Sequence, residues 1–81
     1  MTELSWEIEK IVDVANCLQR TGRSGASTSE IIAAAFVLNR QDLLPDGYTD
    51  MIEAWERLGS EWQGYVMLIK GAFMHMIAQP E

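Results

Sequence analysis

The stretch TDMIEAWERLGSEWQGYVMLIKGAFMHMIA, residues 49–78, decides the fold that the sequence predicts. Its apolar residues recur at alternating steps of four and three, the spacing that places a continuous seam along one side of an α-helix. A second apolar row lies beside this seam, so we predict a long C-terminal helix with more apolar surface than one short partner helix can cover. The seam consists of Met51, Trp55, Leu58, Trp62, Tyr65, Ile69, Ala72 and Met76, and the second row of Ile52, Val66, Phe73 and Ile77.

Gly59 and Ser60 leave open whether this stretch is one helix or two. Residues 60–63, Ser-Glu-Trp-Gln, match a capping box, which is a signal for the start of a separate helix. The apolar seam, however, crosses Gly59 without losing phase. We therefore predict one helix over residues 49–78, capped by Thr49, with a kink or break at residues 59–60 as the alternative.

Residues 3–20 are predicted to form an amphipathic helix. Apolar residues recur along one side of it and charged residues occupy the other, as expected for a helix that packs on one face. Gly22 follows the last periodic residue and supplies the expected stop. The apolar side consists of Leu4, Ile8, Ile11, Ala15 and Leu18.

A third helix is predicted over residues 28–43. It begins with a capping box, in which Ser27 and Glu30 bond each other's backbone amides, and it must end before Pro45. Residues 31–38 are apolar on every side of this helix. A helix without a polar face is normally central in a bundle or enclosed between two chains.

These patterns predict an all-α fold, a single helical domain over residues 1–81 built as a small bundle of three helices, or four if residues 59–60 break the last one. A chain of 81 residues buries only about 60% of its unfolded surface, so its core is marginal without further support. Cys17 is the only cysteine and His75 the only histidine, which excludes a disulfide and a zinc site within one chain. Oligomerisation is the remaining common source of stability, and we predict a homodimer.

The charge of the chain bears on its partners and its location. Twelve acidic and six basic side chains give a net charge of −6, which weighs against binding to nucleic acids or anionic membranes. The most apolar run, residues 65–77, contains Lys70 and His75 and is shorter than the roughly twenty residues that span a bilayer. The N-terminus lacks the features of a signal peptide, and a lone thiol fits a reducing compartment. We therefore expect a cytoplasmic protein.

Residue patterns typical of catalysis are missing from the sequence. His75 is the only imidazole, and it stands between two methionines on an apolar helix, where a packed or partly exposed side chain is the ordinary interpretation. Glu53 and Arg57 are four residues apart, so a surface ion pair accounts for them. No glycine-rich nucleotide-binding motif is present. We predict that the protein is not an enzyme and has no catalytic, metal-binding or cofactor-binding residues.

Small residues in the C-terminal stretch point to contact with another helix. Gly64, Gly71 and Ala78 are seven residues apart and therefore nearly in line on one side of the helix. Glycine in a helix interior costs about 0.5–1 kcal/mol relative to alanine, so its use here suggests close approach by a neighbouring helix. The alternative is that these residues are simply tolerated on a crowded surface.

Aromatic and methionine side chains give the second signal for an interface. Tryptophan is enriched at interface hot spots and methionine on adaptable binding surfaces, although both also fill ordinary cores. The sequence does not separate interface from core, because both appear as apolar positions on helices. The residues that we predict at a protein interface are Trp55, Trp62, Gly64, Tyr65, Leu68, Ile69, Gly71, Phe73 and Met76.

The predicted function is that of a small, non-enzymatic protein-interaction module. In general character the chain resembles small bacterial anti-activators and phage-encoded host inhibitors, an analogy of type that rests on no motif. It implies a regulator that binds a larger protein and inhibits or sequesters it. Two alternatives remain open: a structural subunit or assembly chaperone that completes a partner's helical bundle, and a binder of small apolar ligands with a pocket among Phe36, Trp55, Trp62 and the methionines.

Overall fold

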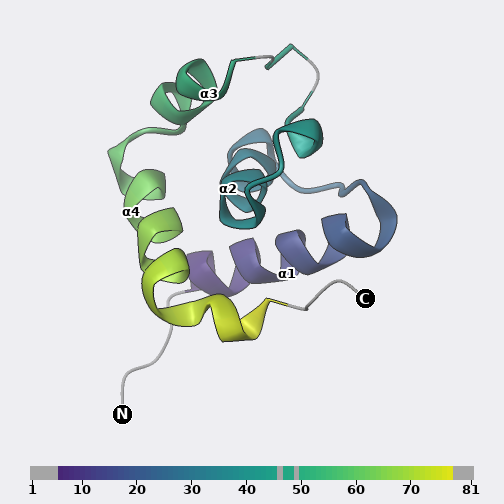
Figure 1. Cartoon of the computed structure of the whole chain (residues 1–81), viewed down its shortest axis with the longest axis vertical. Helices are drawn as coiled ribbons and strands as arrows, with labels where there is room; N and C mark the ends of the chain where they lie inside the picture. The colour runs from purple at the N-terminus through teal and green to yellow at the C-terminus, as the bar shows by residue number, and fades with distance from the viewer. Residues whose placement is uncertain (1–5, 46, 49, 78–81) are drawn as a thin grey trace.

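A computed structural model describes residues 6–45, 47–48 and 50–77 of the chain. It contains four α-helices: α1 (Trp6–Thr21), α2 (Thr28–Leu38), α3 (Met51–Leu58) and α4 (Ser60–Leu68) (Figure 1). A short 3-10 turn, Gln41–Leu43, follows α2, and α4 continues into a π-helix, Ile69–Phe73, and a second 3-10 turn, Met74–Met76. These described residues include no β-strand, so the fold is all-helical.

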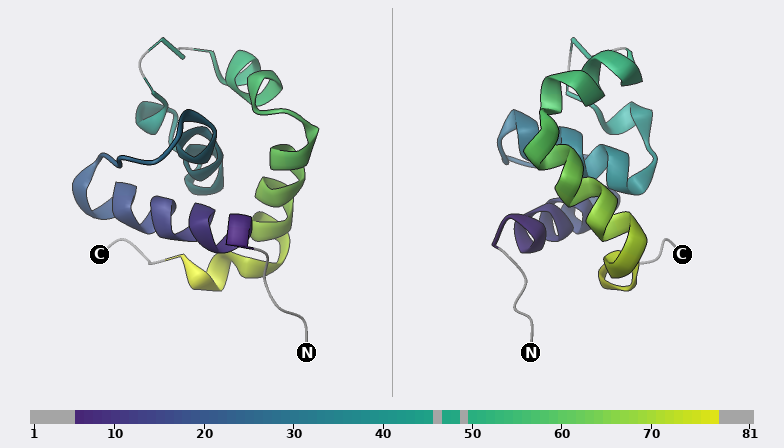
Figure 2. Two further views of the ribbon diagram at one scale, coloured as in Figure 1. Left: turned by 180° about the vertical axis from the view of Figure 1, so that it is seen from behind. Right: turned by 90° about the vertical axis from the view of Figure 1, so that its left-hand side faces the viewer.

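The central element of the fold is α2. It packs against α1, α3, α4 and the 3-10 turn that follows it, and Figures 1 and 2 show it enclosed by the other helices. Its side chains are buried on most sides, because a helix that is apolar all round has no face to offer water. This confirms the prediction for residues 31–38. The fully buried positions of α2 are Ile32, Ala33, Ala34, Ala35 and Val37.

Both ends of α2 are set by local chemistry. At the start, the predicted capping box is confirmed: the Glu30 amide donates to Ser27 Oγ at 3.3 Å and the Ser27 amide donates to Glu30 Oε1 at 3.0 Å. At the end, Asn39 adopts the left-handed conformation with φ 56°, and the amides of Asn39 and Arg40 bond back to Phe36 and Ala35, the pattern of a Schellman motif. The helix therefore stops at Leu38.

The predicted helix over residues 28–43 is too long. The left-handed turn at Asn39 ends it, and the chain resumes as the separate 3-10 turn Gln41–Leu43. A turn follows at Pro45, since the Tyr48 amide donates to the Pro45 carbonyl at 3.1 Å and Gly47 has φ 94°.

The alternative prediction, a break at residues 59–60, is correct, and the prediction of one continuous helix over residues 49–78 is wrong. Gly59 has φ 88° and ψ 158°, a backbone conformation outside any helix, and it separates α3 from α4. The capping box predicted at Ser60 is not the cause, because Gly59 occupies the cap position and makes no side-chain bond. Across the break, the Gln63 side-chain amide donates to the Trp55 carbonyl at 2.7 Å, and this hydrogen bond ties α4 to α3.

The two ends of the C-terminal stretch also differ from the prediction. Asp50, not Thr49, caps α3, because its carboxylate accepts from the Ile52 amide at 2.9 Å. After Leu68 the regular helix gives way to the π-helix and the 3-10 turn. Thr49 and Ala78 lie outside the described residues, as do the first residues of the helix predicted over residues 3–20.

The hydrophobic core lies between α1, α2 and the C-terminal part of the chain. In α1 the buried side chains fall on one side, as the sequence predicts, and Gly22, with φ 79°, follows the helix and bonds back to the Leu18 carbonyl at 2.8 Å. Val66 and Ile69 close the core from α4 and the π-helix. The buried residues of α1 are Ile8, Ile11, Val12, Val14, Ala15 and Leu18.

Candidate protein-interaction surface

One side of α4 and of the following π-helix belongs to the core. Val66 and Ile69 are fully buried there. Trp62 and Tyr65 are half-buried and pack edge to face, with ring centroids 5.7 Å apart and an interplanar angle of 88°. Because α4 packs against α2, this side is already occupied within one chain.

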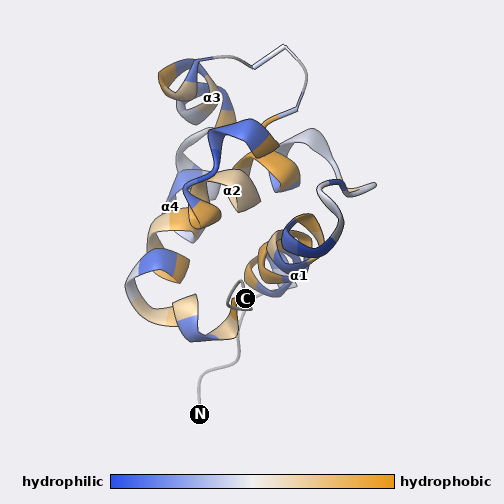
Figure 3. Ribbon diagram, turned by 45° about the vertical axis from the view of Figure 1, so that its right-hand side comes forward, coloured by the Kyte–Doolittle hydropathy of each residue, from blue (hydrophilic) through white to orange (hydrophobic). Residues whose placement is uncertain are grey.

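The opposite side is exposed, and beyond Glu61, which lies on it at the start of α4, its residues are uncharged up to Ala72. We call it the α4 face and define it as Gly64, Met67, Leu68, Gly71 and Ala72, all of which are exposed. They are spaced three, four, seven and eight residues from Gly64, which places them on one side of the helix. Met67 is 66% exposed and Leu68 48% exposed, two of the large apolar side chains that the described chain leaves in water. Figure 3 shows hydrophobic positions along α4 as well as along the central α2.

The two glycines of the α4 face have no role in the packing of the single chain. A Cβ atom added to Gly64 or to Gly71 meets no atom within 4 Å. Neither glycine has a positive φ, so the backbone does not require glycine at either position. Each therefore weakens the helix by about 0.5–1 kcal/mol relative to alanine without any contact inside the fold.

Trp6 lies at the same end of the molecule as the C-terminal end of α4. It begins α1 and is 65% exposed. The first turn of α1 lies beside the end of α4 in Figures 1 and 2. Burial raises the pKa of the Tyr65 hydroxyl above its ordinary value of 10.0, and the negative charges of Glu61 and Glu7 raise it further. The effect of Glu7 links the start of α1 to Tyr65 on α4.

The structure distributes the predicted interface residues between core and surface. Ile69 is fully buried, so it belongs to the core of the single chain. Trp55 packs edge to face on Phe36 of α2, with centroids 5.0 Å apart. Trp62, Tyr65, Phe73 and Met76 are half-buried against the core, whereas Gly64, Leu68 and Gly71 are exposed.

The nine residues predicted at the interface do not include Met67 and Ala72, although the methionines of the C-terminal stretch are part of the predicted interface signal. Ala72 was assigned to the apolar seam, yet it is exposed. The signal that could have found both is their spacing of three and eight residues from Gly64, the same side on which the glycines fall.

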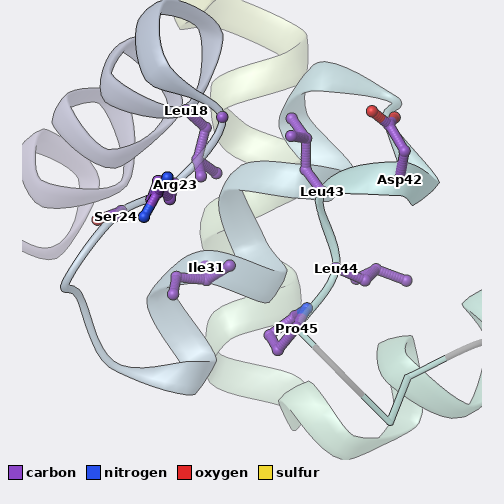
Figure 4. Close-up of a pocket in the computed structure, with 9 residues that line it drawn as sticks. Leu18, Arg23, Ser24, Ile31, Asp42, Leu43, Leu44 and Pro45 are labelled. Atoms are coloured by element: carbon purple, nitrogen blue, oxygen red, sulfur yellow. The ribbon is translucent and has the colours of Figure 1, made fainter.

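A pocket lies on the other side of the molecule, between the end of α1 and the segment after α2. Its volume is about 420 Å³, and nine residues from α1, the loop after it, α2 and residues 42–45 line it (Figure 4). It is separate from the predicted apolar pocket around Phe36 and Trp55, whose rings are in contact with each other. None of the predicted interface residues lines it.

The described residues contain neither a metal-binding cluster nor a membrane-spanning helix. Among these residues, no group of three or more His, Cys, Asp and Glu side chains is arranged to hold a metal ion. None of the helices within residues 6–45, 47–48 and 50–77 has the length and apolar character needed to cross a membrane. Comparison of the chain with protein-family models, with curated proteins and with solved structures gives no significant match.

Proposed function

We propose that this protein is a non-enzymatic protein-interaction module that docks through the α4 face. The observation that carries the proposal is the pair Gly64 and Gly71. Both glycines are exposed in helical segments, and a Cβ atom added to either would meet no atom within 4 Å. A helix keeps such residues at a cost in stability, and the cost is offset where another helix approaches closely. Met67 beside them is flexible and polarisable, which suits an adaptable contact surface.

The occupant that fits this face best is a second copy of the chain. The protein has a net charge of −6, so two copies repel each other wherever acidic residues meet. The five residues of the α4 face are uncharged, and Glu61, three residues before Gly64, is the acidic residue that borders them on the same side of α4. A two-fold axis through it brings the same apolar and small residues together from both chains, as an isologous dimer requires.

A stable interface needs a larger area than these five residues provide, so the contact must extend beyond them. A standard interface removes roughly 800 Å² from each partner, about 15% of the 5283 Å² surface of this chain. Trp6, which begins α1 and is 65% exposed, is the aromatic residue that we propose as a further contact. Aromatic anchors of this kind supply much of the binding energy in protein interfaces.

The biological role that we propose for the dimer is regulation of a larger protein by inhibition or sequestration. Ile52 is 71% exposed on α3, outside the residues of the α4 face, and we propose it as part of a second contact surface that dimerisation leaves free. The alternative role is a structural subunit or assembly chaperone. Deletion separates the two roles: the target of a regulator becomes more active without this protein, whereas the client of a chaperone misfolds.

Sedimentation velocity over a range of protein concentrations tests the docking surface. The variant Leu68→Glu places a charge on the α4 face, and the matched control Ile52→Glu makes the same kind of change on α3. We expect a dimer at tens of micromolar for the wild type and for Ile52→Glu, and a monomer for Leu68→Glu. A monomeric wild type, or a dimer that is lost only in Ile52→Glu, contradicts the proposal.

A further inference from the structure

The pocket beside α1 has the chemistry of a second, independent binding site. We propose that it binds a small apolar carboxylic acid, with the alkyl or aryl body between the apolar walls and the carboxylate on Arg23. This inference does not rest on the α4 face, since no residue of that face lines the pocket.

About half of the exposed lining of the pocket is apolar, and aliphatic side chains and a proline supply most of this half. Leu18 and Ile31 lie on one side of it and Leu43 and Leu44 on the other, with Pro45 below them in Figure 4. The volume of about 420 Å³ falls within the roughly 300–1,000 Å³ that is usual for small-molecule sites. Such walls favour an apolar body of limited length.

The end of the pocket beside Arg23 carries a positive charge. Two charged residues line it, Arg23 and Asp42. Asp42 is already paired, because Arg40 donates to its two carboxylate oxygens at 2.9 and 2.7 Å, and this bond lowers the pKa of Asp42. Arg23 has no carboxylate within salt-bridge distance among the residues that the structure describes. Figure 4 shows Arg23 and Asp42 at opposite ends of the pocket, so an anion on Arg23 stays clear of the acid.

The backbone around Arg23 is fixed before any ligand binds. The Thr21 hydroxyl donates to the Arg23 carbonyl at 2.8 Å, and the Arg23 amide bonds to the same hydroxyl oxygen at 3.3 Å. The Cys17 thiol donates to the same carbonyl at 3.4 Å. Ser24 Oγ accepts from the Ala26 amide at 3.1 Å, which leaves the hydroxyl proton of Ser24 available for a ligand oxygen.

The opposite wall is held in the same way. The Leu43 amide donates to the Arg40 carbonyl and the Leu44 amide to the Gln41 carbonyl, both at 3.1 Å. A site whose two walls are fixed by local hydrogen bonds loses little conformational entropy on binding.

The net charge of the chain selects among anionic ligands. At −6 the protein repels polyanions and acidic peptides, whereas a single carboxylate on a neutral apolar body is repelled least. One guanidinium and one hydroxyl also match the hydrogen-bonding capacity of one carboxylate. These features favour a monocarboxylic acid with a short apolar body.

An NMR titration of the full chain tests this assignment with three probes. Octanoate carries both the body and the charge, octan-1-ol carries the body alone, and acetate carries the charge alone. We expect saturable amide shifts at Arg23, Ser24 and Leu44 with octanoate, weaker binding of octan-1-ol and no saturable binding of acetate. Arg23→Gln should weaken octanoate binding about fivefold, and the matched charge control Arg57→Gln on α3 should leave it unchanged.

Three results overturn the assignment: octan-1-ol binds as tightly as octanoate, Arg23→Gln and Arg57→Gln behave alike, or octanoate shifts amides of the α4 face in place of those around Arg23. Peptides that end in a free carboxylate after an apolar residue form a separate arm of the experiment. If they bind at this pocket and octanoate does not, the small-acid assignment is wrong. The dimer measurements above are independent of every one of these outcomes.

Discussion

The ammonium group of Lys70 lies 2.6 Å from Asn39 Oδ1 and 3.2 Å from the Phe36 carbonyl oxygen. It therefore joins the π-helix after α4 to the C-terminal end of α2, across 31 residues of sequence. The end of a helix carries a partial negative charge and unpaired carbonyl groups, so a cation is favourable there. This contact ties the segment after α4 to the central helix α2, while the Gln63 bond to Trp55 ties α4 to α3.

Replacing Lys70 removes the link between α4 and α2. Lys70→Met should lower the free energy of unfolding by about 1 kcal/mol, because a charge-assisted hydrogen bond at a helix end is lost from an exposed position. Urea denaturation measures the change. Lys10→Met, which removes an exposed lysine from α1, serves as the control and should change stability by less. Equal losses in the two variants would mean that the Lys70 contact adds nothing to the fold.

Gly59 should tolerate no side chain, because its φ of 88° is a conformation that L-residues rarely adopt. Gly59→Ala should cost about 1–3 kcal/mol of stability through backbone strain alone, since an added Cβ meets no atom within 4 Å. Gly25→Ala is the matched control: its surroundings are equally open and its φ is not positive. Thermal unfolding of the two variants compares them. If Gly59→Ala is as stable as Gly25→Ala, α3 and α4 are not separated as described.

The α4 face predicts opposite effects of one substitution on folding and on association. Gly64→Ala should raise the stability of the isolated chain by about 0.5–1 kcal/mol, because it improves helix propensity in open space. The same methyl group should weaken the dimer by about 1–3 kcal/mol, because it separates two closely packed helices. Denaturation at low concentration gives the first value and sedimentation equilibrium the second. A variant that is more stable and still associates as the wild type does would remove the α4 face from the interface.

Tyr65 should titrate above its ordinary pKa of 10.0. Burial and the carboxylates of Glu61 and Glu7 disfavour the charged phenolate in the folded protein, so the folded state holds the phenol proton more tightly than the unfolded state does. The resulting stability is complete below the unfolded pKa and is lost as the pH rises through the folded pKa.

Tyrosinate absorbance, with Tyr65→Phe to assign the signal, measures this pKa. Glu61→Gln and Glu7→Gln should each lower the pKa of Tyr65 towards its ordinary value, whereas Glu53→Gln on α3 should not. The Glu7 variant is the informative one, because Glu7 belongs to α1. No change in that variant would show that the start of α1 does not lie beside α4.

The sequence predicts those parts of the fold that depend on neighbouring residues. The capping box of Ser27 and Glu30 and the fully apolar residues 31–38 are read directly from short patterns, and the structure confirms both. The end of α2 was harder to place, because Asn39 ends the helix through a backbone conformation that asparagine tolerates but does not require.

The break at Gly59 was only the alternative prediction, for a physical reason. The apolar seam keeps its phase across the break, and we took this as evidence for one helix. In the structure α3 and α4 both pack against α2, so residues on either side of Gly59, such as Leu58 and Trp62, turn towards the same core. The spacing of apolar residues therefore indicates which side of the chain is buried, but it does not indicate whether the helix is continuous.

Core and surface could not be separated in the candidate site for a related reason. Leu68 and Ile69 are adjacent aliphatic residues, yet one is exposed and the other is fully buried. Hydrophobicity cannot distinguish them, because the choice depends on how α4 is rotated against α2. Gly64 and Gly71 are a separate sequence signal, because a glycine that weakens a helix without a need inside the fold favours a contact outside it.

The most direct test of the α4 face is an isotope-filtered NOE experiment on a mixture of labelled and unlabelled protein. It detects only contacts between two chains. We predict intermolecular NOEs from the Met67 and Leu68 methyl groups to the α-protons of Gly64 and Gly71. Intermolecular NOEs that arise instead from Ile52 on α3, or their complete absence at concentrations where the protein is expected to associate, would contradict the assignment of this face as the docking surface.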